Sequence, residues 1–401
     1  MENKSLKPKI RFKGFTEAWE QRKLGEIYKF HYGEFNNNPS NGGIYPVFGA
    51  NGIIGGYTDY NAENSVIIGH MGEYAGSVLW GNGKHFVTYN GTISKPKGEH
   101  IISKFGYYML YQKDINKICG GSGLPFLSYE QLDKIEVCYP KDIEEQKAIS
   151  DYLTYLDNLI TLHQRKCDKL MNIKKSLLEK MFPKNGNNIP EIRFKGFTEA
   201  WEQRKLEEVF ISLQNNTLSR ADLSTEQGIA KNIHYGDILV NYGEVLNVDT
   251  EKLTMIDNES VIMKYKSSFL QNGDVVMADT AEDETVGKCT EIDGLENQIV
   301  VSGLHTIPYR PQIKFASKYL GYYMNSNAYH NQLLPLMQGI KVTSISKTAM
   351  QKTEIIYPKT KEEQSKIGEY FCNIDNLITL HQKKLNKLKN IKKSLLDKMF
   401  V

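Results

Sequence analysis

YPKDIEEQKAISDYLTYLDNLITLHQRKCDKLMNIKKSLLEKMF runs from Tyr139 to Phe182, and a close copy, YPKTKEEQSKIGEYFCNIDNLITLHQKKLNKLKNIKKSLLDKMF, runs from Tyr357 to Phe400. The two copies are identical at 29 of 44 positions. After the proline near its start, each copy has more than thirty residues with no proline and almost no glycine. We therefore predict two long helices with a common design.

Ten residues in each copy, eight of them apolar, recur at alternating spacings of four and three, from Ile149 to Met181 in the first copy and from Ile367 to Met399 in the second. This alternation is typical of a coiled-coil seam. About 40 helical residues would span roughly 60 Å. The pattern therefore predicts two rod-like helices that pack against a helical partner.

The charges within each copy indicate how the helices would pair. Residues 141–162 carry two lysines and five acids (net −3), whereas residues 163–182 carry six bases and two acids (net +4). The second copy changes from −1 over 359–382 to +6 over 383–401. Antiparallel packing sets the acidic start of one helix against the basic end of the other. We predict an antiparallel pair with approximate twofold symmetry.

A second repeat precedes the helices. IRFKGFTEAWEQRKL occupies Ile10–Leu24 and returns unchanged at Ile192–Leu206. The segments between the repeated ends, 25–138 and 207–356, barely resemble each other. Such a pattern favours one scaffold that carries two different inserts, although a tandem duplication with freely drifting middles is the alternative. We expect an α+β protein with four parts: a first globular domain at 1–140, a helix at 141–184, a second domain at 185–358 and a helix at 359–401.

Composition narrows the class of protein. The 401 residues are 40% hydrophobic and 24% charged, as in a globular chain, and carry a net charge of only +3. The sequence shows no signal peptide and no apolar run long enough for a membrane helix, which predicts a cytoplasmic protein without a membrane partner. The five cysteines are scattered and lack CxxC spacing, so we expect reduced thiols and no metal site.

These repeats resemble those of a known family, the specificity subunits of type I restriction–modification systems. The resemblance covers essentially the whole chain through the doubled KGFTEAWEQRKL head, the doubled YP…EEQ helix and the two unlike middles. It implies that the middles are target-recognition domains, each reading one half of a bipartite, asymmetric DNA site. The helices would fix the gap between the half-sites and dock two methyltransferase subunits, and restriction subunits would join the complex.

The chain lacks the catalytic motifs that such a complex needs. It has no NPPY-like or DPPY-like motif, no GxGxxG after a strand and no GxxxxGK[ST] phosphate loop. We therefore expect a reader without catalysis and without a cofactor of its own, and we assign S-adenosylmethionine, ATP and Mg²⁺ to the partner subunits. Two other classes remain open: a structural adaptor that holds two proteins without reading DNA, and an enzyme with an unrecognised site.

The first middle is rich in glycine, asparagine and tyrosine, with short strand-like runs such as Ser65–Gly69 and Phe86–Tyr89. Its polar loop residues are the candidates for DNA contact, because asparagine can bond adenine and lysine can reach guanine or phosphate. The alternative is that these residues only build turns. The candidates are Asn36, Asn37, Asn38, Ser40, Asn41, His70, Lys84, His85 and Ser122.

The second middle contains GDILVNYGEVL and GDVVMADTA, which both read as strands. Its acids from Asp279 to Glu284 are interpreted as solvated loop charges, with a metal site as the alternative. The candidates for DNA contact are Asn215, Asn216, Ser219, Arg220, Lys264, Lys266, Lys288, Arg310, Lys341 and Thr343.

Each domain is expected to contain a late helix, marked by FGYYMLYQ from Phe105 and LGYYMNSN from Leu320, followed by a glycine-containing loop. Because the two loops, 120–128 and 337–346, hold equivalent positions, we expect a recurring structural role and contact with phosphate. The paired tyrosines of the late helices are interpreted as core residues. The near-identical lysine-rich helix ends favour a shared protein partner over DNA.

Overall fold

The computed structural model describes residues 6–35, 38–120, 124–184, 186–339 and 341–401. By its internal contacts the chain divides into two units, residues 1–164 with 382–401 (unit 1) and residues 165–381 (unit 2). The division falls inside both long helices, so each unit contains the start of one helix and the end of the other. Each half of a long helix packs into the globular core of its unit.

Both predicted long helices are present. Helix α4 is Ile143–Lys180 and helix α11 is Lys361–Met399. Each has two glutamates in its first turn and a lysine in its last turn, which suits the helix dipole. Among the described residues, no helix has both the length and the apolar character that a membrane span requires.

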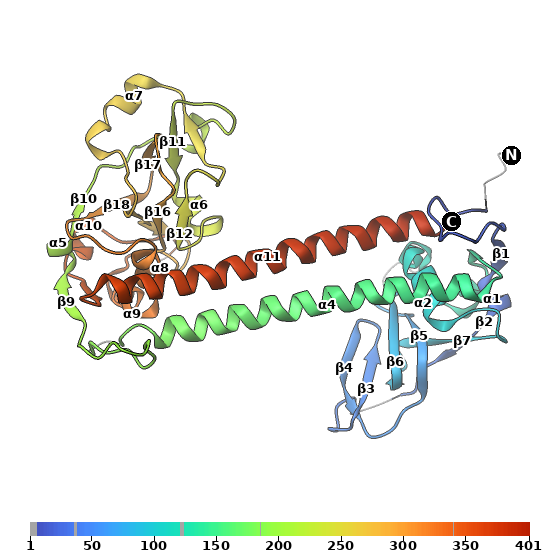
Figure 1. Cartoon of the computed structure of the whole chain (residues 1–401). Helices are drawn as coiled ribbons and strands as arrows, with labels where there is room; N and C mark the ends of the chain where they lie inside the picture. The colour runs from blue at the N-terminus through green and yellow to red at the C-terminus, as the bar shows by residue number, and fades with distance from the viewer. Residues whose placement is uncertain (1–5, 36–37, 121–123, 185, 340) are drawn as a thin grey trace. The chain divides into compact units, whose positions relative to one another are not determined.

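Unit 1 is built on a six-stranded sheet in the order β2-β7-β5-β6-β3-β4 (Figure 1). A separate strand pair joins the repeated head to the residues before α4. The strands are β1 (Glu20–Lys23), β2 (Tyr28–Tyr32), β3 (Tyr45–Gly49), β4 (Gly52–Tyr57), β5 (Ala62–Gly69), β6 (Val78–Val87), β7 (Gly91–Pro96) and β8 (Glu136–Tyr139). The helices besides α4 are α1 (Leu24–Ile27), α2 (Ser103–Gln112), η1 (Ile115–Ile118) and α3 (Tyr129–Asp133).

Unit 2 has a five-stranded sheet in the order β10-β18-β14-β16-β12 and a three-stranded sheet, β13-β11-β17. Its strands are β9 (Glu202–Lys205), β10 (Phe210–Ser212), β11 (Ala230–Ile233), β12 (Val245–Asn247), β13 (Thr254–Ile256), β14 (Val275–Ala278), β15 (Thr280–Ala281), β16 (Cys289–Asp293), β17 (Ile299–Ser302), β18 (Thr306–Pro311), β19 (Thr343–Ser344) and β20 (Glu354–Tyr357). Its shorter helices are α5 (Leu206–Val209), η2 (Arg220–Asp222), α6 (Tyr235–Val240), α7 (Glu259–Met263), η3 (Lys266–Ser268), α8 (Tyr319–Asn325), α9 (Asn327–His330), η4 (Leu334–Leu336) and α10 (Lys347–Met350).

The two unlike middles share one sheet framework. The order β2-β7-β5-β6-β3 in unit 1 matches β10-β18-β14-β16-β12 in unit 2, and in both only the last pair, β6–β3 or β16–β12, is parallel. The registers also match, because Tyr28 pairs with Pro96 as Phe210 pairs with Pro311. The middles therefore differ in the residues and loops placed on a common sheet.

One strand expectation was wrong. The stretch GDILVNYGEVL forms helix α6 before it reaches β12. The Nδ1 atom of His234 accepts a hydrogen bond from the backbone N–H of Gly236 and caps the helix, while Ile238 is buried in the core. This local cap and tertiary burial outweigh the strand preference of the valines and isoleucine. The other stretch, GDVVMADTA, forms β14 and β15 as expected.

Candidate nucleic-acid interface

The repeated head fixes each unit through a buried ion pair. In unit 1 the guanidinium of Arg11 donates to both carboxylate oxygens of Glu145 at 2.6 and 2.7 Å, and the indole N–H of Trp19 lies 3.4 Å from the same carboxylate. The Glu145 side chain is fully buried. A charge buried this deeply needs such partners, and the repeated EEQ motif supplies it at the start of α4.

The same ion pair recurs in unit 2. Arg193 donates to Glu363 at 2.6 and 2.8 Å, and the indole N–H of Trp201 again lies 3.4 Å from the carboxylate. The following glutamine of each EEQ motif is also buried and bonds the backbone beside the helix. Gln146 contacts Ile102, His100 and Pro140, and Gln364 contacts Ala316 and Pro358.

Each head also contacts the end of the other long helix. In unit 1 the backbone N–H of Ile10 donates to the carbonyl of Lys398, and the ring of Phe400 packs 6.1 Å from Trp19. In unit 2 Ile192 donates to Lys180, and Phe182 packs 6.2 Å from Trp201. These contacts explain why the fifteen-residue head is repeated unchanged. Each copy of the head joins the start of one long helix, the end of the other and a paired strand, β8 or β20.

A tyrosine, an aspartate and a lysine form a second repeated contact. In unit 1 the hydroxyl of Tyr108 donates to Asp157 at 2.7 Å, and Lys392 binds the same carboxylate at 2.5 Å. In unit 2 the corresponding set is Tyr322, Asp375 and Lys174, with both contacts at 2.7 Å. The tyrosines belong to the predicted late helices α2 and α8.

Their core interpretation is confirmed for Tyr108, Tyr322 and Tyr323, which are each at most 2% exposed, whereas Tyr107 is partly buried and packs against the edge of the core. A direct match of the GYY letters would pair Tyr107, rather than Tyr108, with Tyr322. The contacts show that the helices instead align on Ser103 and Ser317, with the glycine shifted by one position.

The aspartate and the lysine of each contact line two corresponding grooves. Groove 1, in unit 1, is lined by Tyr111, Gln112, Asp157, Ile160, Lys389, Lys392, Lys393, Leu396 and Asp397. Groove 2, in unit 2, is lined by Met171, Lys174, Lys175, Leu178, Glu179, Glu244, Asn325, Ser326, Asn327, Asp375 and Ile378. Seven lining positions correspond in the repeat, and five of them hold the same residue.

The two glycine-containing loops have the recurring structural role that their positions predict. In unit 1 Leu127 donates its N–H to the carbonyl of His70, the residue directly after β5. In unit 2 Ile345 donates to the carbonyl of Asp279, directly after β14. Each loop therefore crosses the end of the central strand, next to the hairpin that leads to β6 or β16.

In unit 1 this hairpin carries an aromatic cluster around His70. The imidazole is fully buried and stacks 4.2 Å from the ring of Tyr32, which in turn stacks 4.2 Å from Tyr129. Burial lowers the pKa of His70, and within the described residues neither ring nitrogen has a hydrogen-bond partner. Tyr89 and Phe126 also contact the imidazole and are 47% and 41% exposed, so the cluster reaches the surface.

A family model for the type I restriction modification DNA specificity domain matches residues 16–172 and again residues 198–390. Two matches thus cover most of the chain, one in each repeat. The chain belongs to this family of type I DNA specificity proteins.

Individual relatives agree with the family match. The type I restriction enzyme MjaVIII specificity subunit of Methanocaldococcus jannaschii is 23% identical over 348 residues, which are 84% of this chain and 78% of that one. A type I specificity subunit of Mycoplasma genitalium is 29% identical over 170 residues, which are 40% of this chain and 43% of that one.

Two solved structures share the fold. The crystal structure of the type I restriction–modification S subunit from M. genitalium has a TM-score of 0.63 at 15% identity and covers 98% of this chain and 99% of its own. A chain from a structure of type I restriction–modification complex assembly has a TM-score of 0.50 at 16% identity, with coverage of 95% and 97%.

Several of the candidate DNA residues of unit 1 lie inside the protein. His85 is fully buried, with its ring nitrogens bonded to the Ser65 hydroxyl and the Gly83 carbonyl. His70 is equally buried, so a direct base contact by its ring is excluded in this conformation. Asn41, in contrast, is exposed, and its side-chain oxygen closes a turn by accepting from the backbone N–H of Gly43. Asn36, Asn37 and Ser122 lie outside the described residues.

The exposed candidates of unit 1 are fewer. Asn38 and Ser40 are exposed beside each other in the segment before β3. Lys84 is exposed and its ammonium lies 4.4 Å from the ring centre of Tyr60. The exposed aromatic residues Tyr89 and Phe126 were missed, because tyrosine and glycine in this segment predict turns and core positions as readily as surface.

Four candidates of unit 2 also form hydrogen bonds or ion pairs within the protein. These side chains already bond partners within the fold, which favours structural roles over base contact. Asn216 is buried and bonds Asn232 and Ser302; Asn215 bonds Gly303; Lys288 bonds Leu239; and Arg310 pairs with Asp274 at 2.7 Å.

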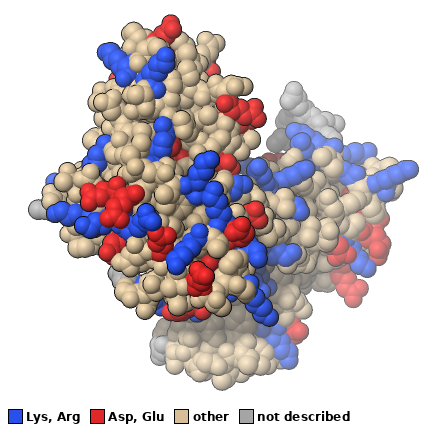
Figure 2. Space-filling model, turned by 60° about the vertical axis from the view of Figure 1, so that its left-hand side comes forward, with Lys and Arg blue, Asp and Glu red and all other residues tan. Residues whose placement is uncertain are grey.

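The remaining candidates of unit 2 are at or near the surface. Arg220 is 56% exposed although it pairs with Asp237 at 2.6 Å, and Ser219 caps the turn that carries it. Lys264 and Lys266 are exposed directly after the end of α7, and Lys341 and Thr343 lie in the second loop. Figure 2 shows basic side chains together with acidic ones at the tip that carries α7, and a similar mixture over the rest of this face.

Proposed function

We propose that this chain is the DNA specificity subunit of a type I restriction–modification enzyme, and that each unit reads one half of a bipartite, asymmetric site. The observation that carries the proposal is the contrast inside the repeat. The two units share a sheet framework, a buried ion pair and a groove, yet they present different loops and side chains. One scaffold with two different surfaces is what reading two different half-sites requires.

The proposed reading surfaces are the exposed residues around the sheet ends and loops. In unit 1 these are Asn38, Ser40, Lys84, Tyr89 and Phe126. In unit 2 they are Ser219, Arg220, Lys264, Lys266 and Lys341, together with the partly exposed Thr343. Amide and hydroxyl groups can bond base edges, aromatic rings can contact a thymine methyl group, and lysines can neutralise phosphates.

We further propose that α4 and α11 pack as an antiparallel coiled coil with approximate twofold symmetry and so fix the gap between the half-sites. The repeated contacts support this arrangement. Asp157 in the first half of α4 binds Lys392 in the second half of α11, and Asp375 in the first half of α11 binds Lys174 in the second half of α4. The first contact lies within unit 1 and the second within unit 2.

Grooves 1 and 2 are the proposed docking sites for two copies of a methyltransferase subunit, with restriction subunits joining the complex. Their shared residues favour a partner that is the same in both halves. In this proposal the chain itself is non-catalytic and acts in the cytoplasm, and S-adenosylmethionine, ATP and Mg²⁺ are bound by the partner subunits. Within the described residues no group of three His, Cys, Asp or Glu side chains is placed to hold a metal ion.

Methylation-sensitive sequencing of genomic DNA tests the proposal. Cells carrying this chain with its methyltransferase subunit are compared with cells carrying the methyltransferase alone. The expected result is a split motif that is modified only when this chain is present. An unchanged pattern of methylation, with the complex shown to assemble, would instead support an adaptor that holds proteins without reading DNA.

A further inference from the structure

We propose that Glu244 is a positioning residue that locks the second reading sheet onto α4 and α11 and so holds the gap between the half-sites to one length. The inference rests on the proposed function, because a gap exists only if two half-sites are read. It goes beyond that function by assigning a spacing role to a side chain outside the long helices.

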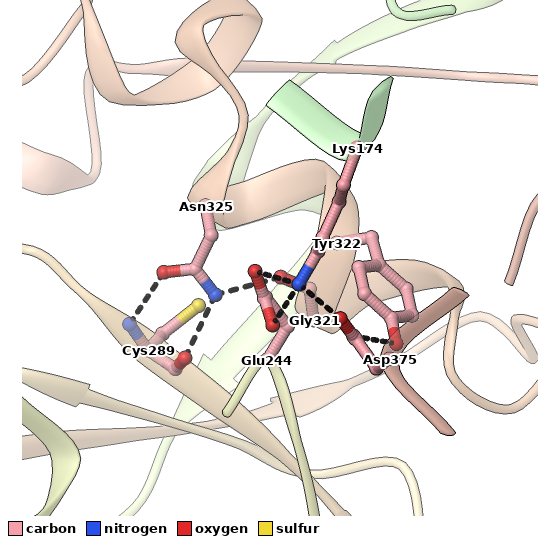
Figure 3. A network of polar contacts seen from close by, with 7 residues as sticks. All are labelled: Lys174, Glu244, Cys289, Gly321, Tyr322, Asn325 and Asp375. Carbon is pink, nitrogen blue, oxygen red and sulfur yellow. Dashed lines mark hydrogen bonds and ion pairs between the residues drawn. The ribbon is translucent and has the colours of Figure 1, made fainter. Parts of the chain in front are cut away.

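The lock is a short chain of polar contacts in unit 2 (Figure 3). The ammonium of Lys174 in α4 lies 2.8 and 2.9 Å from the two carboxylate oxygens of Glu244 and 2.7 Å from Asp375 in α11. The other oxygen of Asp375 accepts from the hydroxyl of Tyr322 in α8 at 2.7 Å. One ammonium thus joins both long helices to the segment that leads into β12.

Glu244 is itself held firmly to the sheet. Its carbonyl accepts the backbone N–H of Glu291 in β16 at 2.9 Å. A Cβ atom at Gly321 would lie 2.0 Å from that carbonyl oxygen, so α8 approaches Glu244 as closely as only glycine allows. The backbone of Glu244 therefore cannot shift toward or away from Lys174 unless β16 and α8 move with it.

A second clamp joins α8 to the same strand. The side-chain amide of Asn325 donates to the carbonyls of Cys289 and Gly321 at 2.8 and 2.7 Å and accepts from the N–H of Cys289 at 3.0 Å. Figure 3 shows these bonds beside the Lys174 contacts. Sheet and late helix consequently form one rigid body around Glu244.

Charge strengthens the contact of Lys174 with Glu244 and Asp375. Lys174 is only 15% exposed, and the carboxylates of Glu244 and Asp375 outweigh the opposing effect of burial and raise its pKa. Burial also raises the pKa of Asp375, against the attraction of Lys174. The ammonium is shared between two carboxylates in a partly dehydrated site, where the pairing is stronger than on an open surface.

Unit 1 shows that the fold does not depend on this extra carboxylate. Its corresponding lysine, Lys392, binds Asp157 and lies 5.5 and 5.3 Å from the ring centres of Tyr108 and Tyr111. Within its described residues groove 1 has three lysines and two acids, whereas groove 2 has two lysines and three acids. Glu244 is the addition that binds the sheet of unit 2 to the helices.

The test uses the full chain assembled with its methyltransferase subunits. Methylation is measured on DNA that carries the two half-sites found by genomic sequencing, with the gap changed from two base pairs shorter to two base pairs longer. For Glu244→Gln we expect the use of the neighbouring gaps, relative to the natural gap, to rise about fivefold, as the loss of one ion pair allows. The half-site letters should not change.

Glu244→Asp keeps the charge and should restore most of the preference for the natural gap. If Glu244 served folding alone, neither variant would change the ratio of methylation at the neighbouring gaps to methylation at the natural gap. Glu296→Gln, at an exposed position in the same domain, is the matched control and should leave the ratio unchanged. A uniform loss of methylation at every gap, or an unchanged ratio, would overturn the lock. If the unaltered chain supported no split-site methylation, the proposed function itself would fail.

Discussion

The guanidinium of Arg11 holds both carboxylate oxygens of Glu145, 134 residues further along the chain, at 2.6 and 2.7 Å. The pair joins the repeated head to the first turn of α4, where Glu145 is fully buried. Removing one partner of a buried pair leaves the other charge without compensation. This contact is therefore expected to stabilise unit 1 more than any exposed ion pair.

We predict that Glu145→Ala destabilises unit 1 by about 3 kcal/mol. Chemical denaturation, with hydrogen exchange read at β1 and β8, measures the loss. The matched control is Glu130→Ala, because Glu130 and its partner Lys134 are 78% and 69% exposed and water screens their attraction, so the loss should be far smaller. Equal losses for the two variants would contradict the role of burial.

Phe400→Ala should loosen unit 1 although the residue lies at the end of the second repeat. Its ring packs 6.1 Å from Trp19 and 5.6 Å from Phe105, and truncating a buried phenylalanine costs about 3 kcal/mol or more. Hydrogen exchange should become faster in β1 and α2 and stay unchanged in the sheet of unit 2. Phe182→Ala should show the opposite distribution, and the same distribution for both variants would argue against the cross-repeat packing.

Lys264→Ala and Lys266→Ala should weaken DNA binding by the assembled complex without lowering its melting temperature. Both side chains are exposed at the tip of unit 2. A lysine that neutralises one phosphate contributes about one unit to the slope of log affinity against log salt concentration. Titrations at several salt concentrations measure this slope. Lys195→Ala, an exposed lysine in the repeated head, should leave the slope unchanged if the tip is the contact.

Asn216→Ala should act on stability rather than on reading. The buried amide donates to Asn232 and to the Ser302 carbonyl and accepts from the N–H of Leu218. Leaving these groups without partners should cost about 1–3 kcal/mol. Thermal denaturation checks the loss, and genomic sequencing should find the same motif in cells that carry the variant. A changed second half-site would return Asn216 to the list of base-reading residues.

Stability should fall as the pH drops below about 6.5, the ordinary pKa of histidine. Burial lowers the pKa of His70 and His85 in the folded protein, so the unfolded chain binds more protons in this range. The contribution of each neutral histidine is complete above about pH 6.5 and is lost as the pH falls toward the folded pKa. Denaturant titrations at pH 7.5 and 5.5 measure the change, and His70→Gln should make it smaller.

Much of the helical scaffold could be predicted from local pattern. The 4–3 spacing and the missing prolines fix the extent of α4 and α11, because periodicity and helix propensity act within a few residues. The repeated heads and EEQ motifs likewise predicted a duplicated architecture. Family membership follows from the same repeats.

The reading surfaces could not be predicted in the same way. Asn216 and Lys264 are both polar residues outside the helices and strands, yet one is buried and the other exposed. Burial depends on strands that lie far away in the sequence, such as β11 and β17, which close over Asn216. The residues next to Asn216 in the sequence therefore do not reveal whether it is buried.

The sequence by itself determined that this chain has two equivalent halves with long helices, because repetition and periodicity are properties of the letters. Only the tertiary structure decided that the unlike middles share one sheet order and that Glu244 reaches Lys174. Both depend on contacts between residues tens of positions apart. Such contacts are selected by packing and charge in three dimensions, and many different sequences satisfy the same framework.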